Sequence, residues 1–178
     1  ADNSLHDIAS QALAKIHHTE HLADSHLLRH FNTIQALVNK GSVHDIDAAL
    51  RDENFTKVNG EADKWLTKAV ETYQHGCPVS AALTVEMFKH ASKLSLEQVL
   101  YMEMNASLHC VNYPDFREGV RALLIDKDKS PKWSKTLDEC DASYIQSHLA
   151  SAFPNSEHPF EAWLGSDSLS AKLAKLAV

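Results

Sequence analysis

Histidines are the side chains in this sequence that most readily suggest chemistry. Of the twelve, His17 with His21 and His26 with His30 stand at i,i+4 spacing, which places each pair on one face of a helix, as zinc ligands often are. No H-E-x-x-H motif accompanies them, and the intervening HLADS stretch separates two predicted helices. A zinc site needs three or four convergent ligands. We therefore expect no metal site.

The sequence also lacks the motifs that are typical of nucleophilic catalysis. There is no G-x-S-x-G sequence, and the side chains of Ser25 and His26, neighbours on a predicted helix, point in different directions. The five glycines are isolated, so no glycine-rich loop can cradle a phosphate. Cys77, Cys110 and Cys140 form no C-x-x-C pair, which indicates buried free thiols. From the residues alone we assign no catalytic residue.

Charge and hydropathy limit the expected partners. The net charge is -7 and the basic residues are scattered, which argues against a nucleic-acid or anionic-membrane surface. No run of 18 apolar residues and no basic-then-apolar leader is present, so we predict neither a membrane span nor a signal peptide. The expected location is the cytoplasm of a bacterium or the mitochondrial matrix of a eukaryote.

The elements that position these residues are predicted to be helices. Apolar side chains recur every three or four residues, whereas alternating patterns are short, so the fold class is all-α. The predicted helices run from Ser4 to Ile16, Asp24 to Val38, Ser42 to Leu50, Glu61 to Gln74, from Pro78 past Phe88, from a Ser95-x-x-Gln98 capping box to about Cys110, and from Asp115 to Ile125. Residues 51–60 are expected to form a loop. Beyond residue 133 we predict a helix around 144–153, a short one at HPFEAWLG, and the amphipathic tail SLSAKLAKLAV.

The stretch from Asn112 to Trp133 departs from this regular pattern. Asp115 is predicted to be the N-cap of its helix, with Glu118 three residues later completing a capping box. Gly119 inside that helix costs about 1 kcal/mol relative to alanine, so we expect a close helix crossing there. The helix is predicted to end in the sequence DKDKSPKW.

Several motifs in the middle third carry a family resemblance. They are Pro78 and Ser80 at a helix start, M-E at 102–103, D-F-x-E-G-V-R-A at 115–122, L-I-D-K-D at 124–128 and P-K-W at 131–133. From Cys77 to Trp133 the sequence closely resembles the C-terminal region of the 3-hydroxyisobutyryl-CoA hydrolases, within the enoyl-CoA hydratase/isomerase, or crotonase, superfamily. Residues 25–73 are similar in layout, and the part after Trp133 resembles a variable tail.

The resemblance implies a division of the protein. In the family, an N-terminal spiral of ββα units binds the acyl-CoA, and its backbone amides and carboxylates perform catalysis; we expect this chain to lack that core. Residues 1–133 would be a helical domain carrying the signature 77–133, and residues 134–178 a variable helical tail. The intact protein would hydrolyse 3-hydroxyisobutyryl-CoA to the free hydroxy acid and CoA in valine breakdown, while this chain alone would not be catalytic.

The resemblance also suggests roles for single residues and partners. Lys127 is the nearest counterpart of a family lysine at the nucleotide end of CoA, where its neighbours Asp126 and Asp128 would oppose a phosphate. The alternative is a solvated ion pair. Arg121 is expected to tie helices together through a carboxylate, and Pro131 with Trp133 to anchor the helix exit. No cofactor is expected beyond the CoA of the substrate. The superfamily often forms trimers, so a homo-oligomer is in keeping with the resemblance.

Two alternatives to the hydrolase remain open at this point. One is an enoyl-CoA hydratase or isomerase of other specificity, which the I-D-K-D and P-K-W segments disfavour. The other is a stand-alone helical interaction module without catalysis. A partial domain would leave an apolar face exposed where its missing core should dock, whereas a stand-alone module would seal its core.

Overall fold

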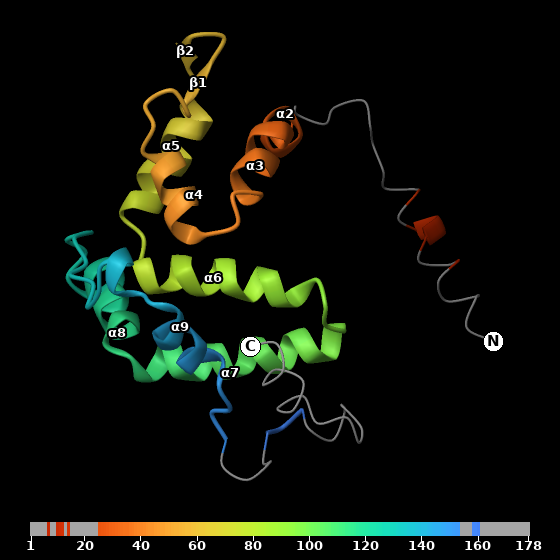
Figure 1. Ribbon diagram of the computed structural model, residues 1–178, viewed down its shortest axis with the longest axis vertical. Helices are drawn as coiled ribbons and strands as arrows, with labels where there is room; N and C mark the ends of the chain where they lie inside the picture. The colour runs from red at the N-terminus through yellow and green to blue at the C-terminus, as the bar shows by residue number, and fades with distance from the viewer. Residues whose placement is uncertain (1–6, 8–9, 13, 15–24, 154–157, 161–178) are drawn as a thin grey trace. The chain divides into compact units, whose positions relative to one another are not determined.

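The computed structural model describes residues 7, 10–12, 14, 25–153 and 158–160, and this part of the chain is mostly helical (Figure 1). The predicted helix from Ser4, the HPFEAWLG helix beyond Phe160 and the tail lie largely or wholly outside these residues. The chain divides into two units, Ala1–Asn39 and Lys40–Val178, and the predicted boundary after Trp133 stays a prediction. Among the described helices none is long and apolar enough to cross a membrane.

Residues 25–38 of the first unit form two short helices in place of one predicted helix. Helix α2 spans His26–Arg29 and α3 spans Phe31–Val38. Ser25 caps α2, since its hydroxyl accepts a hydrogen bond from the Leu28 amide at 3.4 Å. The interruption falls at His30, whose side chain is buried. The helical prediction is therefore confirmed apart from this break.

A helix, a hairpin and a second helix begin the second unit. Helix α4 (Val43–Leu50) starts at the predicted Ser42 cap. Strands β1 (Lys57–Val58) and β2 (Glu61–Ala62) then pair antiparallel around Asn59 and Gly60, whose φ angles of 53° and 83° fit a type I′ turn. Helix α5 (Lys64–Gln74) follows. The predicted loop at 51–60 is confirmed except for strand β1, and the predicted helix start at Glu61 is wrong, because the Asn-Gly turn signal was overlooked.

The core of the second unit lies between three helices. In Figure 1, α6 (Pro78–Ala91) and α7 (Leu96–Asn112) run side by side in opposite directions, with α9 (Ala142–Leu149) packed against both. Met102 is fully buried among Leu83, Ala106, Ile145 and Leu149. Truncating a side chain of this size in a core costs about 2–5 kcal/mol, so these contacts hold α6, α7 and α9 together.

The stretch that contains the family-like motifs follows α7. Helix α8 covers Pro114–Val120 and continues directly into a π-helical turn, η1, at Arg121–Ile125. The i to i+5 hydrogen bond from the Asp126 amide to the Arg121 carbonyl measures 2.8 Å. An irregular segment then leads to the short 3-10 helix η2 (Leu137–Glu139). Because this segment returns to α8, it shapes the site described next.

Candidate functional site

A groove lies on the second unit between α5, the start of α6, α8 with η1, and the segment that follows η1. Its volume is about 890 Å³. Apolar and aromatic side chains make most of its wall, including Phe116, Val120, Leu123, Leu124, Pro131 and Trp133. Polar groups are fewer, and the charged ones are Lys68, Glu71, Asp115 and Lys129.

Asp115 joins three segments in this groove instead of capping its helix. Its Oδ1 accepts a hydrogen bond from the Ser134 amide at 2.7 Å, and its Oδ2 accepts one from Cys77 Sγ at 3.5 Å. The N-cap of α8 is Tyr113, and Pro114 occupies the first helical position. The predicted capping box of Asp115 and Glu118 is therefore wrong. The carboxylate of Asp115 serves tertiary contacts, which leaves little of it free to act as a base.

The cysteines near the groove are thiols in a weakly polar setting. Cys77 and Cys110 are half-buried and line the groove, while Cys140 is buried, and all three are free. Burial raises the pKa of the Cys77 thiol, and the nearby Asp115 carboxylate raises it further although hydrogen bonds from Ser80 oppose this. Burial likewise raises the pKa values of Cys110 and Cys140. A thiol with a raised pKa is a poor nucleophile at neutral pH, so the predicted inert role suits these residues.

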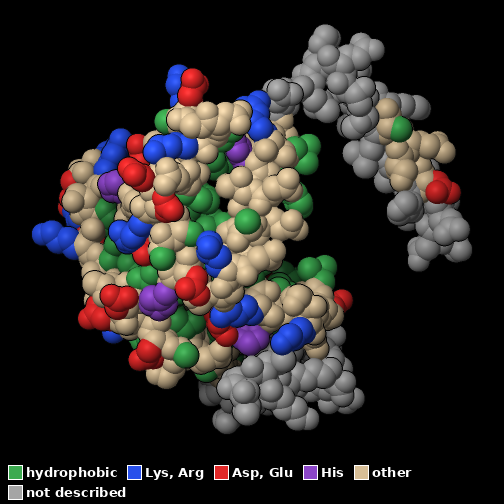
Figure 2. Space-filling view, turned by 45° about the horizontal axis from the view of Figure 1, so that its top comes forward, with side chains coloured by type: hydrophobic (Ala, Val, Ile, Leu, Met, Phe, Trp, Pro, Cys, Tyr) green, Lys and Arg blue, Asp and Glu red, His purple; other side chains and the backbone are tan. Residues whose placement is uncertain are grey.

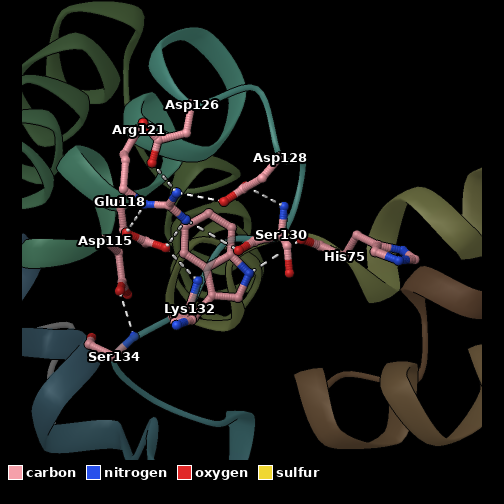
Figure 3. Close-up of polar contacts among 10 residues, drawn as sticks. His75, Asp115, Glu118, Arg121, Asp126, Asp128, Ser130, Lys132 and Ser134 are labelled. Carbon is pink, nitrogen blue, oxygen red and sulfur yellow. Dashed lines mark hydrogen bonds and ion pairs between the residues drawn. The ribbon is translucent and has the colours of Figure 1, made fainter.

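Arg121, the first residue of η1, binds three carboxylates, as Figure 3 shows. We call the cluster of Arg121, Glu118, Asp126 and Asp128 the Arg121 hub. Its Nε and Nη2 bind both oxygens of Glu118 at 2.9 and 2.8 Å, and its Nη1 lies 2.6 Å from both Asp126 and Asp128. The hydrogen bond from Arg121, with a second from the Lys132 amide, lowers the pKa of Glu118 to about 2. Arg121 also lowers the pKa of Asp128. Arg121 thus binds carboxylates as predicted, but they lie on α8 and in the segment after η1, so it ties this segment to α8 and does not join separate helices.

Two further contacts hold the segment against α8 and α5. The Lys132 amide donates to Glu118 at 2.7 Å, and the Trp133 indole N–H donates to the His75 carbonyl at 3.2 Å. A Cβ placed on Gly119 would lie 3.4 Å from the Trp133 ring. The neighbour of Gly119 is thus an indole and not the predicted crossing helix, while the predicted anchoring role of Trp133 is confirmed.

Lys127 lies at the outer side of this hub. Its residue is exposed, its φ is 57°, and it makes no ion pair within the described part of the chain. Its flanking aspartates, Asp126 and Asp128, bind Arg121, and the alternative of a solvated ion pair is not seen among the described residues. Lys129, which the sequence did not single out, lines the groove and also has a positive φ of 54°.

An apolar face borders the groove along α8 and η1. Phe116, Leu123, Leu124 and Ile125 are 52%, 63%, 63% and 69% exposed. Four large apolar side chains within ten residues form the kind of exposed face that a partial domain would present to its missing core. Elsewhere the charges are mixed: Figure 2 shows acidic and basic side chains interspersed over the face in view, without a large patch of one sign.

The two histidine pairs form no common site among the residues that the structure describes. His17 and His21 lie outside the described residues. His26 is exposed on α2, whereas His30 is buried at the break before α3. Among the described residues no three His, Cys, Asp or Glu side chains are placed to hold a metal ion.

The arrangement is suited to binding an apolar surface and offers no evident reaction centre of its own. Asp115, which lines the groove, and Glu118 have each oxygen engaged by a donor, while Glu71, the other carboxylate of the lining, is exposed and pairs with Lys68 at 3.3 Å. General acid-base catalysis needs a carboxyl that can exchange a proton near neutral pH. A pKa of about 2 for Glu118 excludes that role. The pairing of Cys77 with Asp115, 38 residues apart, had no signal in the local sequence.

Comparison with known proteins identifies similar sequences. The family model for enoyl-CoA hydratase/isomerase matches residues 1–149. The mitochondrial 3-hydroxyisobutyryl-CoA hydrolase of Danio rerio is 36% identical over 125 residues, covering 65% of this chain and 31% of the relative. The protein of the same name from Dictyostelium discoideum is 38% identical over 102 residues, covering 56% of this chain and 27% of the relative. The chain thus spans about a third of these relatives.

A solved structure is also similar. The crystal structure of an enoyl-CoA hydratase from Rhodobacter sphaeroides 2.4.1 superposes with a TM-score of 0.62. The match covers 84% of this chain and 43% of that chain, at 22% sequence identity. At this identity the likeness concerns the fold.

Proposed function

The chain belongs to the enoyl-CoA hydratase/isomerase family, and from that premise we propose that the complete protein is an acyl-CoA thioester hydrolase acting on 3-hydroxyisobutyryl-CoA. Water would cleave the thioester to give 3-hydroxyisobutyrate and CoA. The observation that carries the proposal is the identity of 36% and 38% to relatives named 3-hydroxyisobutyryl-CoA hydrolase. The region matched by the family model, residues 1–149, contains the segment 115–133, whose Trp133 lines the groove.

Within the complete protein this chain would be a helical cover that holds no catalytic group. Thioester hydrolysis develops negative charge on the carbonyl oxygen, which must meet preorganised hydrogen-bond donors. Asp115 in the groove is committed to the Ser134 amide and Cys77, and Glu118 to Arg121, which together with the Lys132 amide holds its pKa at about 2. We therefore assign the oxyanion donors and the acid-base carboxylates to the remaining two thirds of the protein.

The exposed face of α8 and η1 would be the contact with that remainder. Burying apolar side chains releases about 25 cal/mol for each Å² removed from water. Leu123, Leu124 and Ile125 are each more than 60% exposed and adjacent in sequence. Their burial against a second body would stabilise both parts, and the groove beside them would then close into a cavity.

Lys127 keeps its proposed role as a contact for the nucleotide end of CoA. Its ammonium is free of ion pairs, and the aspartates on either side are occupied by Arg121, so their repulsion of a phosphate is reduced. In the complete enzyme, Lys127→Ala should raise KM for the acyl-CoA about fivefold at unchanged kcat, as loss of uniform binding does. Lys57→Ala in the β1 strand is the matched control. Equal effects of both substitutions would remove Lys127 from the site.

The expected compartment follows from the relatives. Those from Danio rerio and Dictyostelium discoideum are named mitochondrial. We place a eukaryotic protein of this sequence in the mitochondrial matrix and a bacterial one in the cytoplasm. The proposed homo-oligomer stays a prediction.

The proposal is tested by comparing the complete gene product with residues 1–178. Release of CoA from 3-hydroxyisobutyryl-CoA is followed with a thiol reagent, and hydration of a 2-enoyl-CoA is followed in parallel. We expect the complete product to release CoA and residues 1–178 to release none. Hydration without CoA release would establish the hydratase alternative. CoA release by residues 1–178 alone would overturn the assignment of the catalytic groups to the remainder.

A further inference from the structure

The groove on the second unit contains one buried polar side chain. Among the described residues of its lining, Val79, Ala122 and His148 are buried, at 5%, 2% and 0% exposure. The first two are apolar, whereas His148, on α9, carries two ring nitrogens. A buried polar atom in an apolar setting is unfavourable unless it has a hydrogen-bond partner. The partners of these two nitrogens therefore indicate which ligand the groove can accept.

The two nitrogens of His148 differ in their partners. Nδ1 lies 2.9 Å from the carbonyl oxygen of Tyr144, which can only accept a hydrogen bond, so Nδ1 carries the proton. In the neutral ring, Nε2 then has a lone pair and is an acceptor. Nε2 is buried and meets no hydrogen-bond partner within the described part of the chain. The lining thus includes an acceptor that lacks a donor.

Aromatic side chains hold the His148 ring in place. Tyr113, which also lines the groove, stacks on this ring with the centroids 4.4 Å apart. Tyr144 meets the same ring edge-on at 4.9 Å. Both separations are those of favourable aromatic pairs, and rotating the ring would break the hydrogen bond of Nδ1. The position of the Nε2 acceptor is therefore set before a ligand binds.

The rest of the lining restricts the kind of ligand that fits. Its wall is mostly apolar, and the Asp115 carboxylate is already occupied by the Ser134 amide and Cys77. A ligand that pairs with Nε2 must bring a hydrogen-bond donor on an otherwise apolar group. The acyl group of the proposed substrate has this composition, since 3-hydroxyisobutyryl is a branched four-carbon chain with one hydroxyl.

We propose that His148 selects the hydroxylated acyl group: in the complete protein, its Nε2 accepts a hydrogen bond from the 3-hydroxyl of an acyl group bound in the groove. The inference rests on the proposed function for the identity of that acyl group. A site built to bind a substrate hydroxyl rejects the analogue that lacks it, because the polar group of the site is then left unpaired. His148 is thus a specificity-determining residue that takes no part in cleaving the thioester.

The complete protein tests this with 3-hydroxyisobutyryl-CoA and isobutyryl-CoA, which differ only in the hydroxyl. His148→Phe keeps a ring against Tyr113 and removes the acceptor. The Tyr144 carbonyl retains the Ser147 hydroxyl as a donor, so the variant should fold. We expect the ratio of kcat/KM for the hydroxylated thioester to kcat/KM for the plain one to fall at least about tenfold, as the loss of one hydrogen bond implies. His148→Gln, which retains an acceptor, should keep more of this ratio than His148→Phe.

His109→Phe is the matched control. The His109 ring lies 6.1 Å from the His148 ring in the same aromatic cluster but is not part of the groove lining. This substitution should leave the ratio unchanged. An unchanged ratio in His148→Phe would overturn the proposal, since a purely structural role lowers both kcat/KM values together. An equal fall of the ratio in His109→Phe would overturn it as well.

Failure of the proposed function would be seen separately. If the unmodified protein released CoA from neither thioester, the hydrolase assignment would be wrong, and both thioesters would remain intact as ligands. The nitrogen NMR resonance of His148 Nε2 then reports on the acceptor directly. A shift with the hydroxylated thioester alone supports the role of His148, and equal shifts with both thioesters, or none, overturn it.

Discussion

Helices α7 and α8 begin with a similar spacing of polar side chains but use it differently. At α7, Ser95 accepts a hydrogen bond from the Gln98 amide at 3.4 Å, and the Gln98 side chain returns to the Ser95 amide at 3.0 Å. Asp115 and Glu118 have the same three-residue separation. There, neither side chain caps the helix, and each binds the segment that follows η1 instead.

The difference has two physical causes. Pro114 has no amide hydrogen and favours the first helical position, so α8 starts two residues earlier than an Asp115 cap would give, and Asp115 falls inside it. Arg121 stands one turn after Glu118 and offers a charged fork, which binds a carboxylate more strongly than a single backbone amide does. A capping pattern in the sequence therefore identifies side chains that can accept a hydrogen bond at a helix start. Competing donors elsewhere in the fold determine whether they bind the helix amides or other groups.

Removing the indole of Trp133 should have the largest effect on this part of the molecule. Trp133→Ala deletes both the packing on Gly119 and the hydrogen bond to the His75 carbonyl. Since the side chain is only partly buried, we expect a loss of about 3 kcal/mol in the free energy of unfolding, the lower end for such truncations. Denaturant titration followed by circular dichroism measures it.

The matched variant Trp133→Phe separates the two contributions. It keeps a ring against Gly119 and removes the indole donor, so a loss of about 1 kcal/mol is expected. Equal losses for the Ala and Phe variants would show that the hydrogen bond alone anchors the segment and that the ring contributes nothing.

Replacing Ser95 by aspartate and Asp115 by serine would test the contrast between α7 and α8 directly. Ser95→Asp keeps a good cap and should change the stability of α7 by less than about 0.5 kcal/mol. Asp115→Ser keeps a cap-forming residue but is too short to hold the Ser134 amide and Cys77 together, so we expect a loss of about 2 kcal/mol. Denaturant titrations of the two variants give the comparison. If Asp115→Ser were as mild as Ser95→Asp, Asp115 would be acting as an ordinary cap.

Most helices of the second unit could be predicted from the sequence, because their start signals and apolar spacing lie within the helices themselves. Ser42, Ser95 and Pro78 start helices where the patterns indicate, and apolar spacing identifies α6, α7 and α9. The hairpin at residues 57–62 was missed although Asn59-Gly60 is a strong local signal for it. The groove could not be derived, since it depends on contacts such as Cys77 with Asp115 and Trp133 with His75 that connect distant residues. Lys127 was singled out by resemblance, and its role stays a proposal.

A substitution at Gly119 should have a smaller effect of the opposite sign, a gain in stability. A Cβ at this position would meet the Trp133 ring at 3.4 and 3.6 Å, which is ordinary van der Waals contact. Gly119→Ala should therefore gain up to about 1 kcal/mol from helix propensity without displacing the indole. Thermal unfolding measures the gain. A loss of stability would indicate the close helix crossing that the sequence suggested, and Gly119→Leu, whose larger side chain must push the indole away, should lose stability in either case.

Lowering the pH into the acid range should reduce the stability that the Arg121 hub contributes. Changes of pH near neutrality should leave it unchanged. The pKa of Glu118 is about 2 in the folded chain against an ordinary value of 4.5, because Arg121 and the Lys132 amide stabilise the charged form. A lowered pKa means that the contribution of Glu118 to stability is complete above pH 4.5 and is lost as the pH falls through 2. The unfolding free energy should therefore decrease more between pH 5 and 2 in the unmodified chain than in Glu118→Gln, which cannot titrate. Because the ion pair with Arg121 is only partly buried, 1 M salt should shrink this difference. Parallel pH profiles for the two proteins would mean that the hub binds Glu118 no more tightly than water does, and the contrast between α8 and α7 would then depend on Asp115 and Pro114 alone.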